Sequence, residues 1–295
     1  MADETSPATT TVLIRSSEQV GVAVHDFGRP PRPGAPTLLF THATGFHGLV
    51  WAPVARRLTD RFRCVAVDLR GHGVSQTPST ASLAWTAVAD DVLAVVDALG
   101  EEDGGPLHGV GHSMGGAALV LAAARRPDAF GSLWLFDPAI VPLRAAPPED
   151  MENPMADAAL RRRPRFASFD EAIERYRRKP PLDALHPDAL AAYVHGGFAE
   201  DDDSVRLRCD PLTEATVFRG APASGAWEAL AEVGLPVAVV VGRVEGLSPA
   251  AFAARIVERL PAGVLVERPG VGHFGPLEDP VSAAVDIGDW VDAHS

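Results

Sequence analysis

The sequence predicts an α/β fold in which a mostly parallel central sheet is flanked by helices and interrupted by an inserted helical cap. Three observations carry this prediction. From residue 37 onward, short apolar runs of strand length alternate with segments of helical period. Most of these runs are continuously apolar, which is typical of parallel strands buried on both faces. The alternation stops after Asp137-Pro138 and resumes at Pro236, so the core encloses an insertion.

The first part of the core, residues 1–137, opens with a small, polar segment, residues 1–10, for which we expect a loose tail. A proline-rich stretch, residues 30–36, then requires an extended loop. The clearest helix is 83–99, because its valines share one face and its aspartates lie opposite. The expected strands of this part are 11–15, 21–26, 37–41, 63–68, 107–111 and 132–136, and the expected helices are 49–58, 83–99 and 114–124.

The insertion, residues 138–225, contains prolines, arginine clusters, an acidic run and helical patterns without a convincing strand. We therefore expect a mostly helical cap. The second part of the core, residues 226–295, resumes the alternation. Its expected elements are strands 236–241 and 263–267, a helix over 249–260 and a last helix that ends near Trp290.

Composition narrows the classes of protein to consider. A chain of 295 residues with 46% hydrophobic residues fits one large α/β domain with an insertion, or two small domains. A net charge of −13 argues against a nucleic-acid binder, because the average field repels phosphate. Two cysteines, Cys64 and Cys209, are too few for a disulfide framework and have no metal-ligand spacing. The N-terminus lacks a secretory pattern and no apolar run is long enough to cross a bilayer, so we expect a cytoplasmic protein without a membrane partner.

The strongest chemical signal is Gly111-His112-Ser113-Met114-Gly115-Gly116. It follows an expected strand and opens an expected helix, which is the context that a nucleophilic serine of this motif requires. Glycines on either side permit the sharp turn that exposes the hydroxyl of Ser113. A glycine-rich strand-to-helix turn without chemistry is the structural alternative, and the agreement of strand, turn and helix weighs against it.

A nucleophilic serine needs a base, and the best of the ten histidines is His273. It lies in Pro269-Gly270-Val271-Gly272-His273-Phe274, between the last expected strand and the last helix. Loops at the carboxyl ends of parallel strands gather at one edge of a sheet, so His273 is expected to meet Ser113.

The acid that orients this histidine has two candidates. Glu245 lies in the turn after strand 236–241 and falls between serine and histidine in a suitable chain order. Asp137 closes strand 132–136 at the same edge of the sheet. The chain order favours Glu245, and Asp137 stays as the alternative; the other carboxylate would then be a turn or cap residue.

Backbone N–H groups that could hold an oxyanion come from two places. Met114 begins the helix after the serine, where the helix dipole favours negative charge. The second donor is expected in the loop Thr41-His42-Ala43-Thr44-Gly45-Phe46, with Thr44 preferred and Ala43 as the alternative. A tight strand-to-helix turn without an oxyanion site is the structural alternative, because it would use the same small residues.

Taken together, these segments resemble the α/β-hydrolase superfamily, in its esterase and lipase-like group with a helical cap. The resemblance covers about residues 20–293 and implies an α/β-hydrolase fold, a Ser-His-acid mechanism and no cofactor or metal. Two departures bear on the site, because the family commonly has glycine where Ala43 stands and aspartate where Glu245 stands. The segments that carry the resemblance are the 41–46 loop, Asp68-Leu69-Arg70-Gly71-His72-Gly73-Val74-Ser75, the Ser113 turn, the Glu245 turn and the His273 loop.

The expected reaction is hydrolysis of a small-molecule carboxylic ester through an acyl-enzyme, with Phe46, His112 and Phe274 as candidate substrate-binding residues. The same triad could cleave carbon–carbon bonds, amides or lactones or act as a cofactor-free perhydrolase, and the fold could also serve as a non-catalytic ligand receptor. A basic run in the cap suggests attraction of anionic substrates, although a solvated face balanced by nearby acids is the simpler interpretation. Its members are Arg161, Arg162, Arg163, Arg165, Arg175, Arg177, Arg178 and Lys179.

Overall fold

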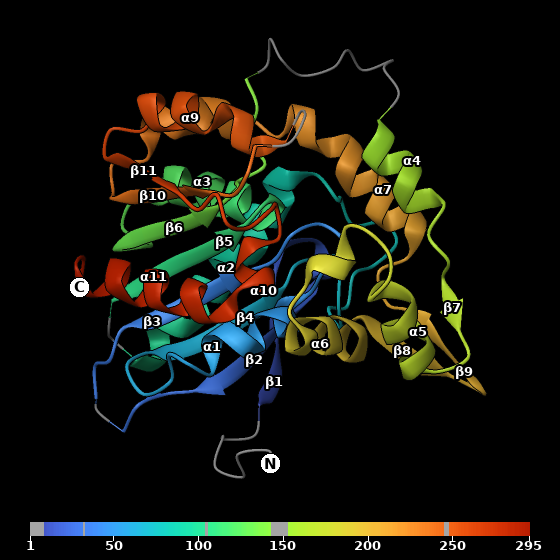
Figure 1. Cartoon of the computed structure of the whole chain (residues 1–295). Coiled ribbons are helices and arrows are strands. Elements are labelled where there is room, and N and C mark those ends of the chain that lie inside the picture. The colour runs from blue at the N-terminus through green and yellow to red at the C-terminus, as the bar shows by residue number, and fades with distance from the viewer. Residues whose placement is uncertain (1–8, 32, 104–105, 143–152, 245–247) are drawn as a thin grey trace.

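A computed structural model describes residues 9–31, 33–103, 106–142, 153–244 and 248–295 of the chain (Figure 1). Its centre is an eight-stranded sheet with the strand order β1-β2-β4-β3-β5-β6-β10-β11. Strand β2 pairs antiparallel with β1 and β4, and every other pair is parallel. The strands are β1 (Thr10–Arg15), β2 (Gly21–Gly28), β3 (Thr37–Thr41), β4 (Arg63–Asp68), β5 (Leu107–His112), β6 (Ser132–Phe136), β10 (Val237–Val241) and β11 (Gly263–Glu267).

Side chains alternate between two apolar layers along the central strands. In β3, Leu39 belongs to one buried cluster, whereas Leu38 and Phe40 belong to the other. In β10, Val239 and Ala238 divide in the same way. Because successive residues of a strand point to opposite faces, a continuously apolar strand must be covered on both. The predicted parallel sheet with helices on both faces is confirmed.

Helices cover the two faces in separate groups (Figure 1). The layer that contains Leu39 is completed by α2 (Trp85–Asp103), α3 (Met114–Arg125), α8 (Ala226–Ala229) and α9 (Ala253–Arg259). The layer that contains Phe40 is completed by α1 (Ala52–Ala55), α6 (Pro187–Gly197) and α11 (Pro280–Asp292), with the short α10 (Gly275–Glu278) just before α11. Within the described residues, no helix combines the length and apolar composition needed to cross a bilayer.

The helix expected over 49–58 is shorter than its apolar pattern suggested. Helix α1 spans only Ala52–Ala55 and follows a 3₁₀ turn, Gly48–Trp51. After α1, the N–H groups of Arg57 and Leu58 each bond a carbonyl three residues earlier, at 3.1 and 2.9 Å. Such i→i+3 bonds close a tighter turn than an α-helix, so the segment is α-helical only at its centre.

The segment between β6 and β10 adds helices and a second small sheet, grouped at one side of the main sheet (Figure 1). The helical expectation missed the antiparallel sheet β7-β9-β8. Its strands are two to four residues long, too short for a period-two pattern, and the acidic run forms the turn of the β8–β9 hairpin with Asp202 at a φ of 50°. The elements are α4 (Pro154–Leu160), β7 (Arg165–Phe166), α5 (Phe169–Tyr176), α6, β8 (Phe198–Asp201), β9 (Ser204–Leu207) and α7 (Pro211–Gly220).

Candidate active site

Ser113 occupies a strained turn between β5 and α3. Its φ of 52° and ψ of −115° lie in a region that residues other than glycine rarely adopt, and such strain concentrates at functional sites. The turn needs its glycines because a Cβ at Gly111 would come within 2.7 Å of the Gly116 Cα. A Cβ at Gly115 would come within 2.6 Å of the Thr41 carbonyl group. The Ser113 N–H donates to the Phe136 carbonyl at 3.0 Å, which fixes the turn against β6.

His273 lies in the loop between β11 and α10, and its partner is Asp137. Nδ1 of His273 lies 3.0 Å from Oδ2 of Asp137. Asp137 follows β6 directly, is fully buried and has a φ of 40°. Its other oxygen, Oδ1, accepts a hydrogen bond from the Gly242 N–H at 3.3 Å. Both carboxylate oxygens therefore face donors, one on the histidine and one at the end of β10.

The structure thus brings the alternative acid, Asp137, to His273. Glu245, which chain order favoured, lies outside the described residues. Strands β6 and β10 are neighbours and end at the same edge of the sheet, so a carboxylate after either strand could reach this point. Asp137 could have been preferred from the sequence because it follows its strand immediately, whereas Glu245 is four residues beyond Val241.

Ser113 and His273 line one cavity of about 320 Å³ at the carboxyl edge of the sheet. Two of the expected substrate-binding residues, Phe46 and Phe274, also line it, with their ring centroids 5.2 Å apart. Most of the remaining wall comes from α4, α5, α6 and α7 of the inserted segment and from the residues that follow α4 and α5. The segment therefore covers the edge of the sheet where the serine and the histidine line the same cavity.

His112 has a different position from the one expected. It is buried and is absent from the residues that line the cavity. Its Nε2 bonds the carbonyl oxygen of His273 at 2.8 Å. Burial, together with the nearby His273, lowers the pKa of His112, so the ring is neutral and its Nε2–H can donate. The residue before the serine thus holds the backbone of the histidine loop.

The loop after β3 forms the opposite wall, with Ala43 and Thr44 on the cavity. The Thr44 hydroxyl donates to the sulfur of Met114 at 3.4 Å, so the two expected sources of N–H donors are in contact. Gly45 has a φ of 79°, and a Cβ there would lie 2.4 Å from Oε1 of Glu214 in α7. The positive φ favours glycine, and the close approach brings the loop against α7 of the inserted segment.

Hydrogen bonds among buried polar residues fix the position of this loop. His42 accepts a bond from the Leu69 N–H at 3.0 Å, and Asp68 accepts one from the Gly48 N–H at 2.6 Å. His25 Nε2 lies 3.0 Å from the same carboxylate, and the Val74 N–H donates to it at 2.8 Å. Burial alone would raise the pKa of Asp68, but the bonds from His25 and Val74 outweigh burial and lower it. The conspicuous 68–75 segment therefore has a structural role in positioning the loop.

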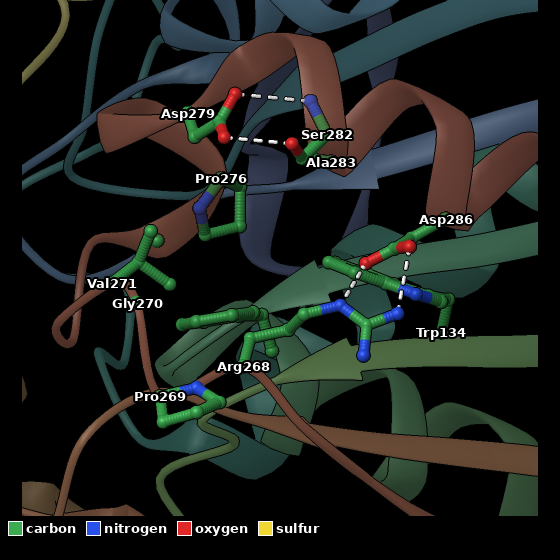
Figure 2. Close-up of a pocket in the computed structure, with 12 residues that line it drawn as sticks. Trp134, Arg268, Pro269, Gly270, Val271, Pro276, Asp279, Ser282, Ala283 and Asp286 are labelled. Atoms are coloured by element: carbon green, nitrogen blue, oxygen red, sulfur yellow. Dashed lines mark hydrogen bonds and ion pairs between the residues drawn. The ribbon is translucent and has the colours of Figure 1, made fainter.

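A second cavity, of about 180 Å³, lies beside the histidine loop (Figure 2). Neither Ser113 nor His273 lines it. Its charged groups all have partners: Arg268 binds Asp286 through two bonds of 2.6 and 2.7 Å, and Asp279 accepts from Ser282 (Figure 2). The Arg268–Asp286 pair fastens the start of the loop to α11, and the Asp279–Ser282 bonds cap α11. The described residues contain no group of three or more His, Cys, Asp or Glu side chains placed to hold a metal ion.

Comparison with known proteins agrees with this arrangement. Residues 38–287 match the model of the alpha/beta hydrolase family. The chain belongs to that family. The sheet order, the serine turn after β5 and the histidine loop after β11 are thus the family's fold, and the resemblance proposed from five sequence segments is confirmed.

Several relatives are hydrolases. The chain is 31% identical over 264 residues to a 2-(acetamidomethylene)succinate hydrolase of Mesorhizobium japonicum. The aligned region covers 88% of each protein. The chain is also 38% identical over 144 residues to protein phosphatase methylesterase 1 of Mus musculus. This aligned region covers 47% of this chain and 36% of the relative. Among solved structures, an E-2-(acetamidomethylene)succinate hydrolase superposes with a TM-score of 0.76 at 26% identity, over 97% of this chain and 99% of the other. The chain is therefore a hydrolase by family.

Proposed function

We propose that this protein is a serine hydrolase in which Ser113 is the nucleophile, His273 the general base and Asp137 the orienting acid. The observation that carries the proposal is the 3.0 Å contact between Nδ1 of His273 and Oδ2 of Asp137. His273 also lines the same cavity as Ser113, whose backbone is strained. Asp137 replaces Glu245 in this role because its carboxylate already faces the Nδ1 that an orienting acid must bind.

The reaction proceeds by acyl transfer. His273 Nε2 takes the proton of the Ser113 hydroxyl as its oxygen attacks the substrate carbonyl, and the buried Asp137 stabilises the imidazolium that forms. His273 then returns the proton to the leaving group. Water, activated by the same histidine, attacks the acyl-enzyme and releases the acid and the free serine. Every proton moves between Ser113, His273, the leaving group and water, so the cycle needs no other reagent.

The negative charge on the carbonyl oxygen is held by the N–H groups of Met114 and Thr44, with Ala43 as the alternative to Thr44. Met114 is the first residue of α3, where backbone N–H groups have no partner within the helix and the helix dipole is favourable. Thr44 lies on the same cavity and contacts Met114 through its hydroxyl. Residues 138–225 act as a cap that encloses the substrate.

Two kinds of scissile bond have support. An ester is the expected substrate, and one relative is named a methylesterase. The relative from Mesorhizobium japonicum has an acetamido group in the name of its substrate, which favours amide hydrolysis as the second candidate. The two reactions share the triad and differ in the leaving group that His273 must protonate.

The first test is hydrolysis of a p-nitrophenyl ester series, acetate through decanoate, by the wild type and by Ser113→Ala. We expect the wild type to turn over at least the short esters and the alanine variant to lose this activity. The chain length that reacts fastest then measures the acyl pocket. A wild type that cleaves no ester of the series but cleaves the matching p-nitroanilides would establish the amidase instead. Turnover that survives in Ser113→Ala would refute the proposed nucleophile.

A further inference from the structure

The wall of the active-site cavity is largely apolar, and its arginine, lysine and glutamate side chains all come from the inserted segment. Phe46, Phe218 and Phe274 are typical of its surface. Three charged side chains interrupt it, namely Arg162, Lys179 and Glu214. At neutral pH these carry two positive charges and one negative charge, so the wall has a net positive charge although the whole protein carries −13.

The other basic residues of the 161–179 run do not contribute to this charge. Arg163 pairs with Glu171 at 2.9 Å, and Arg165 pairs with Asp201. Arg177 and Arg178 both pair with Glu174. Arg161 and Arg175 are exposed and do not line the cavity. The simpler interpretation, a solvated basic face balanced by acids, therefore accounts for the four paired arginines of the eight basic residues. Two more are exposed away from the cavity, and only Arg162 and Lys179 line it.

Arg162 is a largely buried cation with donors to spare. Its Nη1 binds Glu214, and its Nη2 binds the hydroxyl groups of Tyr193 and Tyr176. These contacts use three of the five N–H groups that a guanidinium carries. Burial disfavours the charge, but Tyr193 and Glu214 outweigh burial and raise the pKa of Arg162, so it stays charged.

Lys179 is the cation without a counter-ion. Its side chain is exposed at the cavity wall, and among the described residues no acceptor or acid binds its ammonium group. Glu214 is already bound to Arg162 and packs against Gly45, so it does not neutralise Lys179 directly. An anionic group that entered the cavity would meet this ammonium, and Arg162, which lines the same cavity, has N–H groups that its three contacts do not use.

We propose that the substrate carries a carboxylate in addition to the bond that is cleaved, and that Lys179 and Arg162 bind this carboxylate. The inference rests on the proposed hydrolase function and specifies its substrate class. The proposal also gives Glu214 a role. Its carboxylate binds part of the Arg162 guanidinium and so limits the net charge of the cavity wall to one positive charge. We therefore expect the site to favour substrates with a single free carboxylate over dicarboxylates.

The test compares two esters of nearly equal size that differ in charge. Mono-p-nitrophenyl adipate has a free carboxylate, and methyl p-nitrophenyl adipate has none. The measured quantity is the ratio of kcat/KM for the anionic ester to kcat/KM for the neutral ester. Because both substrates meet the same sample, this ratio is independent of the fraction of a variant that has folded.

We expect Lys179→Gln to lower the ratio about fivefold, since an exposed charge pair contributes up to about 1 kcal/mol. Arg178→Gln is the matched control, because Arg178 is the adjacent cation but pairs with Glu174 outside the cavity. It should leave the ratio unchanged. Glu214→Gln should raise the ratio, because it releases the guanidinium from its counter-ion. Equal ratios in wild type, Lys179→Gln and Glu214→Gln would overturn the inference.

A separate measurement distinguishes failure of this inference from failure of the proposed function. If the wild type cleaves neither ester, the ester hydrolase proposal fails, and titration calorimetry of monomethyl adipate into Ser113→Ala and Ser113→Ala/Lys179→Gln still tests the anion site. Binding that weakens in the double variant supports the carboxylate site without ester hydrolysis. Equal or undetectable binding in both proteins refutes it.

Discussion

Replacing Asp137 by asparagine gives the sharpest test of the site. Asp137 offers one oxygen to His273 Nδ1 at 3.0 Å and the other to the Gly242 N–H at 3.3 Å. Asparagine has a single acceptor oxygen, so either His273 or Gly242 loses its acceptor. Asp137 is fully buried, so water cannot take its place. The negative charge that stabilises the imidazolium of His273 is removed in either orientation of the amide.

We expect kcat to fall by about 10⁴, the loss seen when the acid of a serine triad becomes an amide, which corresponds to about 5.4 kcal/mol of transition-state stabilisation. The free energy of unfolding should fall by only about 1–3 kcal/mol, the cost of one unsatisfied buried donor. Both are measured on the same protein, kcat with a p-nitrophenyl ester and stability by urea unfolding.

Glu245→Gln is the matched comparison, because sequence order alone favoured that residue. It should keep kcat within about threefold of the wild type, because Asp137 already binds Nδ1 of His273. The reasoning is refuted if Glu245→Gln loses the activity while Asp137→Asn stays within tenfold of the wild type.

Two further predictions concern the oxyanion loop and acid stability. Gly45→Ala should lower kcat about 10²–10³-fold at similar KM, because its Cβ would collide with Glu214 and displace one N–H donor. Gly225→Ala, also at positive φ but with open space around its Cβ, should keep kcat, and equal losses in both would exclude the loop explanation. Burial and the nearby His294 lower the pKa of His108 to about 4, whereas in the unfolded chain it is about 6.5. The unfolded state therefore takes up a proton first, and the contribution of His108 to stability, fully present above pH 6.5, falls by about 2 kcal/mol by pH 5. His108→Gln should flatten this decline in urea unfolding at pH 7 and pH 5, and an unchanged slope would contradict the assignment.

The elements and residues that could be predicted from the sequence are those set by local patterns. Strands β3, β4, β6 and β11 have the predicted bounds because each is a short apolar run between breaks. Ser113 could be put forward from the sequence as a candidate nucleophile because its glycines act within a few residues. His273 could be put forward as its base because its loop follows the last strand of the sheet.

Features that depend on contacts distant in sequence were not predictable in the same way. The choice between Asp137 and Glu245 depends on which carboxylate reaches Nδ1 of His273, a matter of a few ångströms between neighbouring strand ends. The sequence also did not show which arginines of the inserted segment face the cavity, since Arg162 and Arg163 are adjacent but only Arg162 lines it. The position of His112 under the histidine loop depends on a contact with a residue 161 positions away.

The chain leaves β6 at Asp137 and enters the inserted segment at once, which has a mechanical consequence. Two residues after Asp137, the Ala139 N–H donates to the Ser113 carbonyl oxygen at 3.0 Å. This bond anchors the departing chain to the serine turn, and Ile140 just beyond it is buried. The backbone therefore joins the two proposed catalytic residues, Asp137 and Ser113, at the point where the inserted segment begins. We expect a displacement of that segment to break this bond before it moves the Asp137 carboxylate.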